Sequence, residues 1–135
     1  GLLSLRRMGE LMKARKELIS IYRDRLGRLP GCWVQKFPAD RTTSGNYFVL
    51  FIAESAKRSR DEVYEALKAV GIQTKRYFYP PVHEQLLFQR FPKRVSVSLQ
   101  HTPKISREGL ALPLYSHMTL EEMNHVCSQV ECLLG

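Results

Sequence analysis

One uncharged run of eight residues, 46–53, constrains the fold more than any other part of the sequence. In this run (NYFVLFIA) nearly every odd and even position is aromatic or aliphatic, so an extended chain carries apolar side chains on both faces. Such a segment predicts an inner strand with protein on both sides of it. We therefore expect a sheet whose cover comes from more than one layer.

Three stretches have the spacing or the capping signals of helices. The first spans about 25 residues and ends before Gly27, a length that exceeds one side of a small domain, so part of it is expected to pack elsewhere. Two capping boxes, Ser59 with Glu62 and Thr119 with Glu122, predict a helix over 60–70 and a terminal helix. The apolar positions of the first helix are Leu5, Met8, Met12, Ile19, Tyr22 and Leu26.

The remaining elements are shorter. Strands are expected over 72–78 and 109–113, and a short helix over 84–91. Thr102 and Pro103 predict a further helix start, with the threonine as N-cap and the proline in the first helical position. The expected order is helix, strand, helix, strand, short helices, strand, helix.

This order predicts an α/β (α+β) two-layer sandwich, in which a small three-stranded sheet has helices mainly on one face and is preceded by a long N-terminal helix. At 135 residues one core is expected, which we divide into the helix, 1–30, and the small domain, 31–135. Helices on one face leave the other face of the 46–53 strand bare. We therefore expect an absent domain or another chain to supply a layer, and the glycine at position 1 favours an excerpt of a longer protein.

Composition excludes several classes of protein. The three cysteines form no CxxC pair, so we expect a reducing compartment and a cytoplasmic location, and the scattered histidines indicate no metal site. No segment has the length of a membrane span. The net charge of +8 is uneven, since residues 1–30 hold eight Lys/Arg against three Asp/Glu. This charge leaves open a basic nucleic-acid-binding or protein-interaction module.

The densest polar and aromatic cluster is 74–83 (TKRYFYPPVH), while glycine-rich phosphate loops and nucleophile motifs are lacking. Strand alternation places Arg76 on the face of Ile72, so its guanidinium either emerges at the end of the sheet or needs an anionic partner. A solvated or structurally ion-paired arginine is the other interpretation. His83 follows two prolines, which aim its side chain with little freedom, although a surface histidine fits the same pattern.

Residues 71–89 (GIQTKRYFYPPVHEQLLFQ) carry a resemblance to a known family. With RDEVYEALKAVGI before them and LALPLYSHMTLEEMNHV after them, they resemble the C-terminal small domain of the DegT/StrS-type sugar aminotransferases, which are pyridoxal-phosphate-dependent enzymes of fold type I. The first helix is similar to the interdomain helix of that family. The resemblance covers nearly the whole chain.

The resemblance implies a fragment of a nucleotide-sugar aminotransferase that is inactive alone. In the intact family, an amino group passes from glutamate to a keto-sugar on a nucleotide, with pyridoxal phosphate (PLP) held by a large domain that supplies the cofactor lysine. That domain is outside this sequence, so no catalytic, cofactor-binding or metal residue is assigned here. Arg76, Tyr79 and His83 are expected to bind substrate. The expected partner is the large PLP-binding domain or a second copy in a homodimer, with no specific nucleic acid and no membrane.

Overall fold

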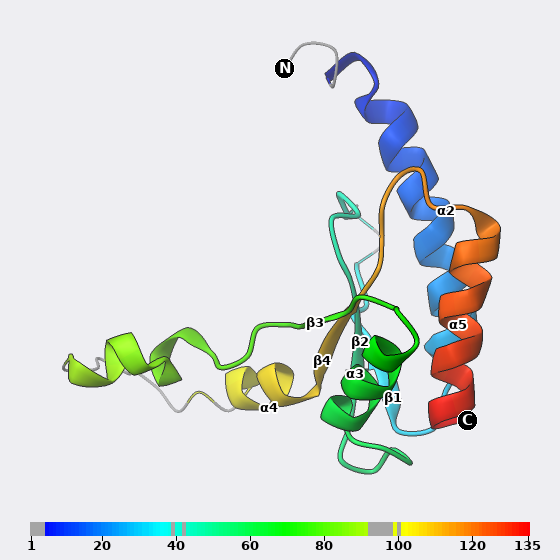
Figure 1. The fold of residues 1–135 in the computed structure, drawn as a ribbon. Coiled ribbons are helices and arrows are strands. Elements are labelled where there is room, and N and C mark those ends of the chain that lie inside the picture. The colour runs from blue at the N-terminus through cyan, green and yellow to red at the C-terminus, as the bar shows by residue number, and fades with distance from the viewer. Residues whose placement is uncertain (1–4, 39, 42, 92–98, 100) are drawn as a thin grey trace.

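The computed structural model describes residues 5–38, 40–41, 43–91, 99 and 101–135, and it has the two-layer α/β architecture that the sequence predicts (Figure 1). Helices α2, α3 and α5 lie on one side of a small antiparallel sheet. The elements in chain order are α2 Met8–Leu26, β1 Cys32–Val34, β2 Phe48–Ile52, α3 Arg60–Ala69, β3 Lys75–Arg76, the 3₁₀ turns Val82–Glu84 and Leu86–Arg90, α4 His101–Glu108, β4 Gly109–Leu112 and α5 Leu120–Leu134.

The sheet has four strands in the order β1-β2-β4-β3, one more than predicted. The inner position of β2 is confirmed, because it pairs with β1 on one side and with β4 on the other. The sequence analysis missed β1, whose three residues are too short for a recognisable alternation. Gly31 leads into β1 with a φ of 71°, and a Cβ there would meet the Ala56 backbone at 2.5 Å, so the turn requires glycine.

The face of β2 toward the helices forms the core. Phe48, Leu50 and Ile52 are buried there against the helices. On the other face, Phe51 is buried because the Trp33 ring of β1 stacks on it with the ring centroids 3.9 Å apart. Tyr47 on the same face is 56% exposed. The expected second cover is therefore supplied in part by the chain's own β1, which the sequence analysis did not foresee.

The helix boundaries follow the predicted signals closely. Both capping boxes are confirmed, at Ser59 for α3 and at Thr119 for α5. Helix α2 ends at Leu26 with Gly27 as its C-cap, and one face of its second half is buried through Leu18, Ile19, Tyr22 and Leu26. Its first turns extend past the sheet (Figure 1), and Met8 is 44% exposed there.

Three predicted elements differ from the structure. The strand expected over 72–78 is reduced to β3. The Tyr77 amide still donates to the Gly109 carbonyl at the start of β4, and beyond it the chain leaves β4. The helix expected over 84–91 is two 3₁₀ turns without a buried residue. Helix α4 begins at His101, so Thr102 lies inside it rather than capping it.

Candidate functional site

Arg76 projects from the edge strand β3 onto helix α3. Its Nε lies 2.8 Å from the Asp61 carboxylate, and its Nη2 lies 3.5 Å from that of Glu65. The guanidinium carbon is 4.2 Å from the centroid of the Tyr64 ring. The side chain is 35% exposed. Arg76 thus has anionic partners, which was one of the two alternatives for its place on the strand, and its side chain also reaches the surface.

Tyr79 lies beside Arg76 at a surface hollow of about 340 Å³. Thr74 lines the same hollow, and its buried hydroxyl oxygen has no hydrogen-bond partner within the described part of the chain. A buried hydroxyl without a partner costs free energy, and this oxygen has no surface open to the hollow. The hollow is lined by Tyr64, Thr74, Lys75, Arg76, Phe78, Tyr79, Pro80 and Gln85.

His83 occupies the first 3₁₀ turn and is not among the residues that line this hollow. Its Nε2 lies 3.5 Å from the Glu84 carboxylate, and its side chain is 28% exposed. The structure therefore brings Arg76 and Tyr79 together and places His83 further along the same segment.

Arg60 is a residue near this site that the sequence analysis treated only as a helix start. It is 4% exposed, and the Tyr79 ring covers its guanidinium with 5.0 Å between the guanidinium carbon and the ring centroid. Burial lowers the pKa of Arg60, and Asp61 opposes that shift. The capping box fixes Arg60 in the first turn of α3 but does not reveal its burial, because the residues around it come from α4 and β4.

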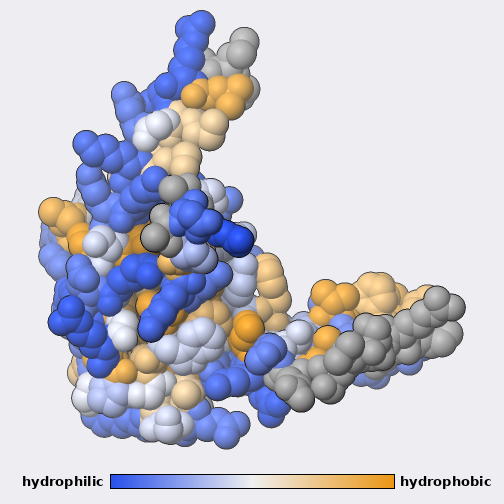
Figure 2. Space-filling view, turned by 180° about the vertical axis from the view of Figure 1, so that it is seen from behind, coloured by the Kyte–Doolittle hydropathy of each residue, from blue (hydrophilic) through white to orange (hydrophobic). Residues whose placement is uncertain are grey.

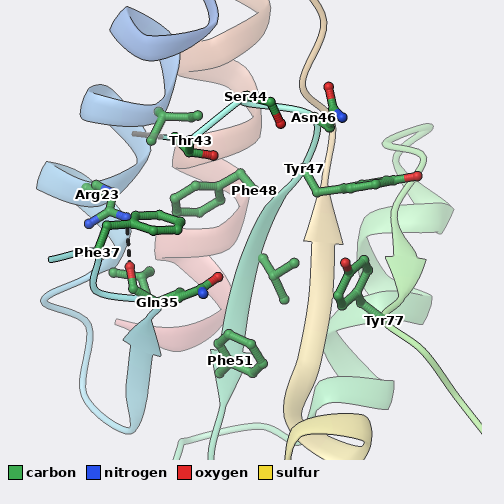
Figure 3. Close-up of a pocket in the computed structure, with 13 residues that line it drawn as sticks. Arg23, Gln35, Phe37, Thr43, Ser44, Asn46, Tyr47, Phe48, Phe51 and Tyr77 are labelled. Carbon is green, nitrogen blue, oxygen red and sulfur yellow. Dashed lines mark hydrogen bonds between the residues drawn. The ribbon is translucent and has the colours of Figure 1, made fainter. Parts of the chain in front are cut away.

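A second hollow, of about 300 Å³, lies on the face of the sheet away from the helices (Figure 3). Tyr47 and Tyr77 lean together there with ring centroids 5.4 Å apart. At the other side, Arg23 lies over the Phe37 ring and donates a hydrogen bond of 2.7 Å to the Gln35 carbonyl. The rim is polar and the floor is apolar, which is typical of a surface that another protein segment covers.

Apolar side chains also gather away from the sheet. Figure 2 shows apolar surface on the arm that carries the two 3₁₀ turns and at the projecting end of α2. Leu86 is 81% exposed on the arm and Leu5 is 61% exposed at the start of the chain. Exposed apolar patches are typical of surfaces that contact another protein, a membrane or a ligand.

No lysine is buried in the part of the chain that the structure describes. All seven lysines in that part are exposed, and Lys93 lies outside it. Among the described residues, no group of three or more His, Cys, Asp or Glu side chains is placed to hold a metal ion. Over the same residues, no helix combines the length and the apolar character needed to cross a bilayer.

Comparison with known proteins gives one consistent family. Residues 1–131 match the DegT/DnrJ/EryC1/StrS aminotransferase family. A dTDP-4-amino-4,6-dideoxy-D-glucose transaminase of Escherichia coli is 30% identical over 126 residues, which are 90% of this chain and 33% of that relative. A dTDP-4-dehydro-2,3,6-trideoxy-D-glucose 4-aminotransferase of Saccharopolyspora spinosa is 27% identical over 97% of this chain and 32% of its own length.

Solved structures agree in fold. The crystal structure of DesI in the presence of its TDP-sugar product matches 98% of this chain with a TM-score of 0.86 and 28% identity, over 33% of that chain. The chain spans about a third of the length of the relatives it matches. These relatives give no support to the basic nucleic-acid-binding module that the charge pattern had left open.

Proposed function

Because the chain belongs to the DegT/DnrJ/EryC1/StrS aminotransferase family, we propose that it forms the small domain of a PLP-dependent nucleotide-sugar aminotransferase. One observation carries the proposal: the match covers nearly all of this chain but only about a third of each relative. In this proposal the whole protein transfers an amino group from glutamate to a keto-sugar on a nucleotide, and these residues do not catalyse the transfer alone.

The side chains described do not fit a complete PLP site. Lysines that form covalent bonds with carbonyl compounds are activated by burial or by neighbouring cations, and all seven described lysines are exposed. We therefore assign the cofactor to the two thirds of the protein outside this sequence. This chain's part is to shape the substrate side of the cleft.

Within that part, Arg76, Tyr79 and His83 are the proposed substrate-binding residues. The hollow beside Tyr79 offers an aromatic ring, the Tyr79 hydroxyl and the partly exposed Arg76, whose guanidinium is also paired with Asp61 and Glu65. Rings and hydroxyl groups suit a sugar, and a guanidinium suits the phosphates of a nucleotide. His83 lies further along the segment, where it can approach a substrate that extends beyond the hollow.

This site assignment predicts a kinetic effect in the polypeptide encoded by the complete reading frame. Tyr79→Ala and His83→Ala should each lower kcat/KM for a dTDP-linked keto-sugar by about 10- to 100-fold, because contacts that hold the substrate are lost. Both residues sit in a segment that is largely exposed, so the thermal midpoint should change little. Gln89→Ala, in the exposed arm, is the matched control.

The outcomes separate two claims. A wild-type full-length protein without amino transfer contradicts the proposed function. If the wild type is active and both variants match it, only the substrate-binding assignment is wrong.

We further propose that the apolar surfaces of this chain contact the rest of its own protein and a second copy. The surfaces are the outer sheet face around Tyr47, the arm with Leu86, and the projecting half of α2 with Leu5 and Met8. Residues 1–30 then serve as an interdomain helix and residues 31–135 as the small domain. The buried second half of α2 supports this arrangement, since it fixes one end of the helix to the sheet while the other end is free to reach a neighbour.

The chain alone should accordingly self-associate through α2. Sedimentation velocity over a wide concentration range should show a dimer or a larger species, because exposed apolar area favours burial at about 25 cal/mol per Å². Met8→Lys should weaken the association about tenfold or more, whereas Ser20→Lys, at an exposed position of the same helix, should not. A wild-type chain that stays monomeric at every concentration would contradict this proposal.

A further inference from the structure

A buried arginine network ties the proposed substrate-binding segment to the body of the fold. Arg60 Nη1 donates hydrogen bonds to the carbonyls of Ser106, at 3.3 Å, and Gly109, at 3.1 Å. These carbonyls belong to the end of α4 and the start of β4. One guanidinium thus holds α3 against the point where helix α4 becomes strand β4.

The same junction holds the start of the segment. The Tyr77 amide donates to the Gly109 carbonyl at 3.1 Å, and the Ser106 hydroxyl donates to the Phe78 carbonyl at 2.5 Å. A Cβ on Gly109 would lie 2.6 Å from the Tyr77 oxygen, so the close approach requires glycine. The carbonyls that Arg60 binds are therefore on the two residues that fix Tyr77 and Phe78.

Arg60 also contacts the Tyr79 side chain directly and is linked to Arg76 through Asp61. The Tyr79 ring covers its guanidinium, and Asp61 Oδ1 lies 2.8 Å from both Arg60 Nε and Arg76 Nε. The contact of Arg60 Nε with Asp61 is ionic rather than an aligned hydrogen bond. Asp61 thus joins the buried arginine to the exposed one, and the two arginines share one carboxylate.

Simple stability does not explain this arrangement well. A buried ion pair is weak evidence for stability, because removing charges from water costs as much as their attraction returns. A planar guanidinium, in contrast, fixes several acceptors at once in set directions, which a lysine cannot do.

We propose that Arg60 is a positioning residue, which sets Tyr79 and Arg76 in the orientation that binds the substrate. The inference rests on the proposed function for its kinetic consequence, but not for its structural one. Without the guanidinium, the Ser106 and Gly109 carbonyls lose a donor and Tyr79 loses the cation beneath its ring. The segment after β3 should then sample other orientations while the core persists.

Amide hydrogen exchange in the 135-residue chain tests the structural part. Arg60→Gln should speed exchange of the Tyr77 amide, which donates to the Gly109 carbonyl, about tenfold or more relative to Leu50 in the core. Arg60→Lys keeps the charge but not the fork of donors, so it should give an intermediate effect. The matched control is Arg58→Gln, an exposed arginine just before the helix, which should leave the exchange pattern unchanged.

If Arg60→Gln does not fold, the variant Ser106→Ala tests the same proposal. It removes only the hydroxyl bonded to the Phe78 carbonyl, so the fold should be retained and the neighbouring Tyr77 amide should exchange faster. Exchange of the Tyr77 amide that is unchanged in Ser106→Ala, or unchanged in a folded Arg60→Gln, overturns the proposal.

Kinetics in the full-length protein test the functional part. Arg60→Gln should raise KM for the nucleotide sugar about tenfold, because the segment must be ordered when substrate binds. A purely structural role would lower the amount of folded enzyme and leave KM unchanged, and that result overturns the proposal. If the full-length wild type lacks amino transfer, the proposed function fails while the exchange measurement still decides the role of Arg60.

Discussion

Tyr22→Ala should lower the free energy of unfolding of the chain by about 3–5 kcal/mol, among the largest effects of any single substitution in it. Tyr22 is fully buried in α2 and stacks on Phe48 of the central strand with ring centroids 4.7 Å apart. Its hydroxyl donates a 2.8 Å hydrogen bond to the Pro113 carbonyl just beyond β4. Burial raises the pKa of this hydroxyl above its ordinary value, so it stays a donor at neutral pH. One side chain thus joins the first helix to two strands.

Urea unfolding followed by circular dichroism measures the effect. Tyr22→Phe keeps the ring and should lose only about 1–2 kcal/mol, because the Pro113 carbonyl then lacks its donor. Tyr47→Ala removes an exposed tyrosine of the same strand region and should cost less than about 1 kcal/mol. A Tyr22→Ala protein as stable as Tyr47→Ala would show that α2 is not an integral part of this fold.

Local sequence patterns were enough to predict the elements that depend on neighbouring residues. The two capping boxes act over three positions, so Ser59 and Thr119 mark the starts of α3 and α5 without any knowledge of the fold. The apolar run 46–53 likewise predicted the inner strand β2. Strand β1 could not be found in this way, since Cys32–Val34 becomes a strand only by pairing with Ile52, Phe51 and Leu50.

The candidate site shows the same difference between features set by neighbouring residues and features set by residues distant in the sequence. Strand alternation left two alternatives for Arg76, emergence at the end of the sheet or an anionic partner, and only the packing of β3 beside α3 shows that Asp61 and Glu65 are partners. Arg60 was missed as a site residue because its partners are 46 and 49 positions away in the sequence. The resemblance to the family identified the segment from Tyr79 to His83, whereas its attachment to α4 and β4 came from the structure alone.

The second large effect is the dependence of amino transfer on the residues outside this sequence. The full-length protein should transfer amino groups from glutamate to a dTDP-linked keto-sugar at least about 10³-fold faster than residues 1–135 alone. The reason is that the seven lysines in the described part of the chain are all exposed, while the match covers only a third of each relative. Borohydride reduction of a PLP mixture, followed by peptide mapping, should find no uniquely modified lysine in the chain alone.

The most direct test compares three preparations in one glutamate-dependent amino-transfer assay: the full-length protein, residues 1–135, and the remaining two thirds expressed separately. We expect activity in the full-length protein, none in residues 1–135, and a large loss in the remaining part, which would lack the proposed substrate-binding residues Arg76, Tyr79 and His83. Amino transfer by residues 1–135 alone, or full activity of the remaining part without them, would contradict the assignment of this chain as the substrate-facing small domain.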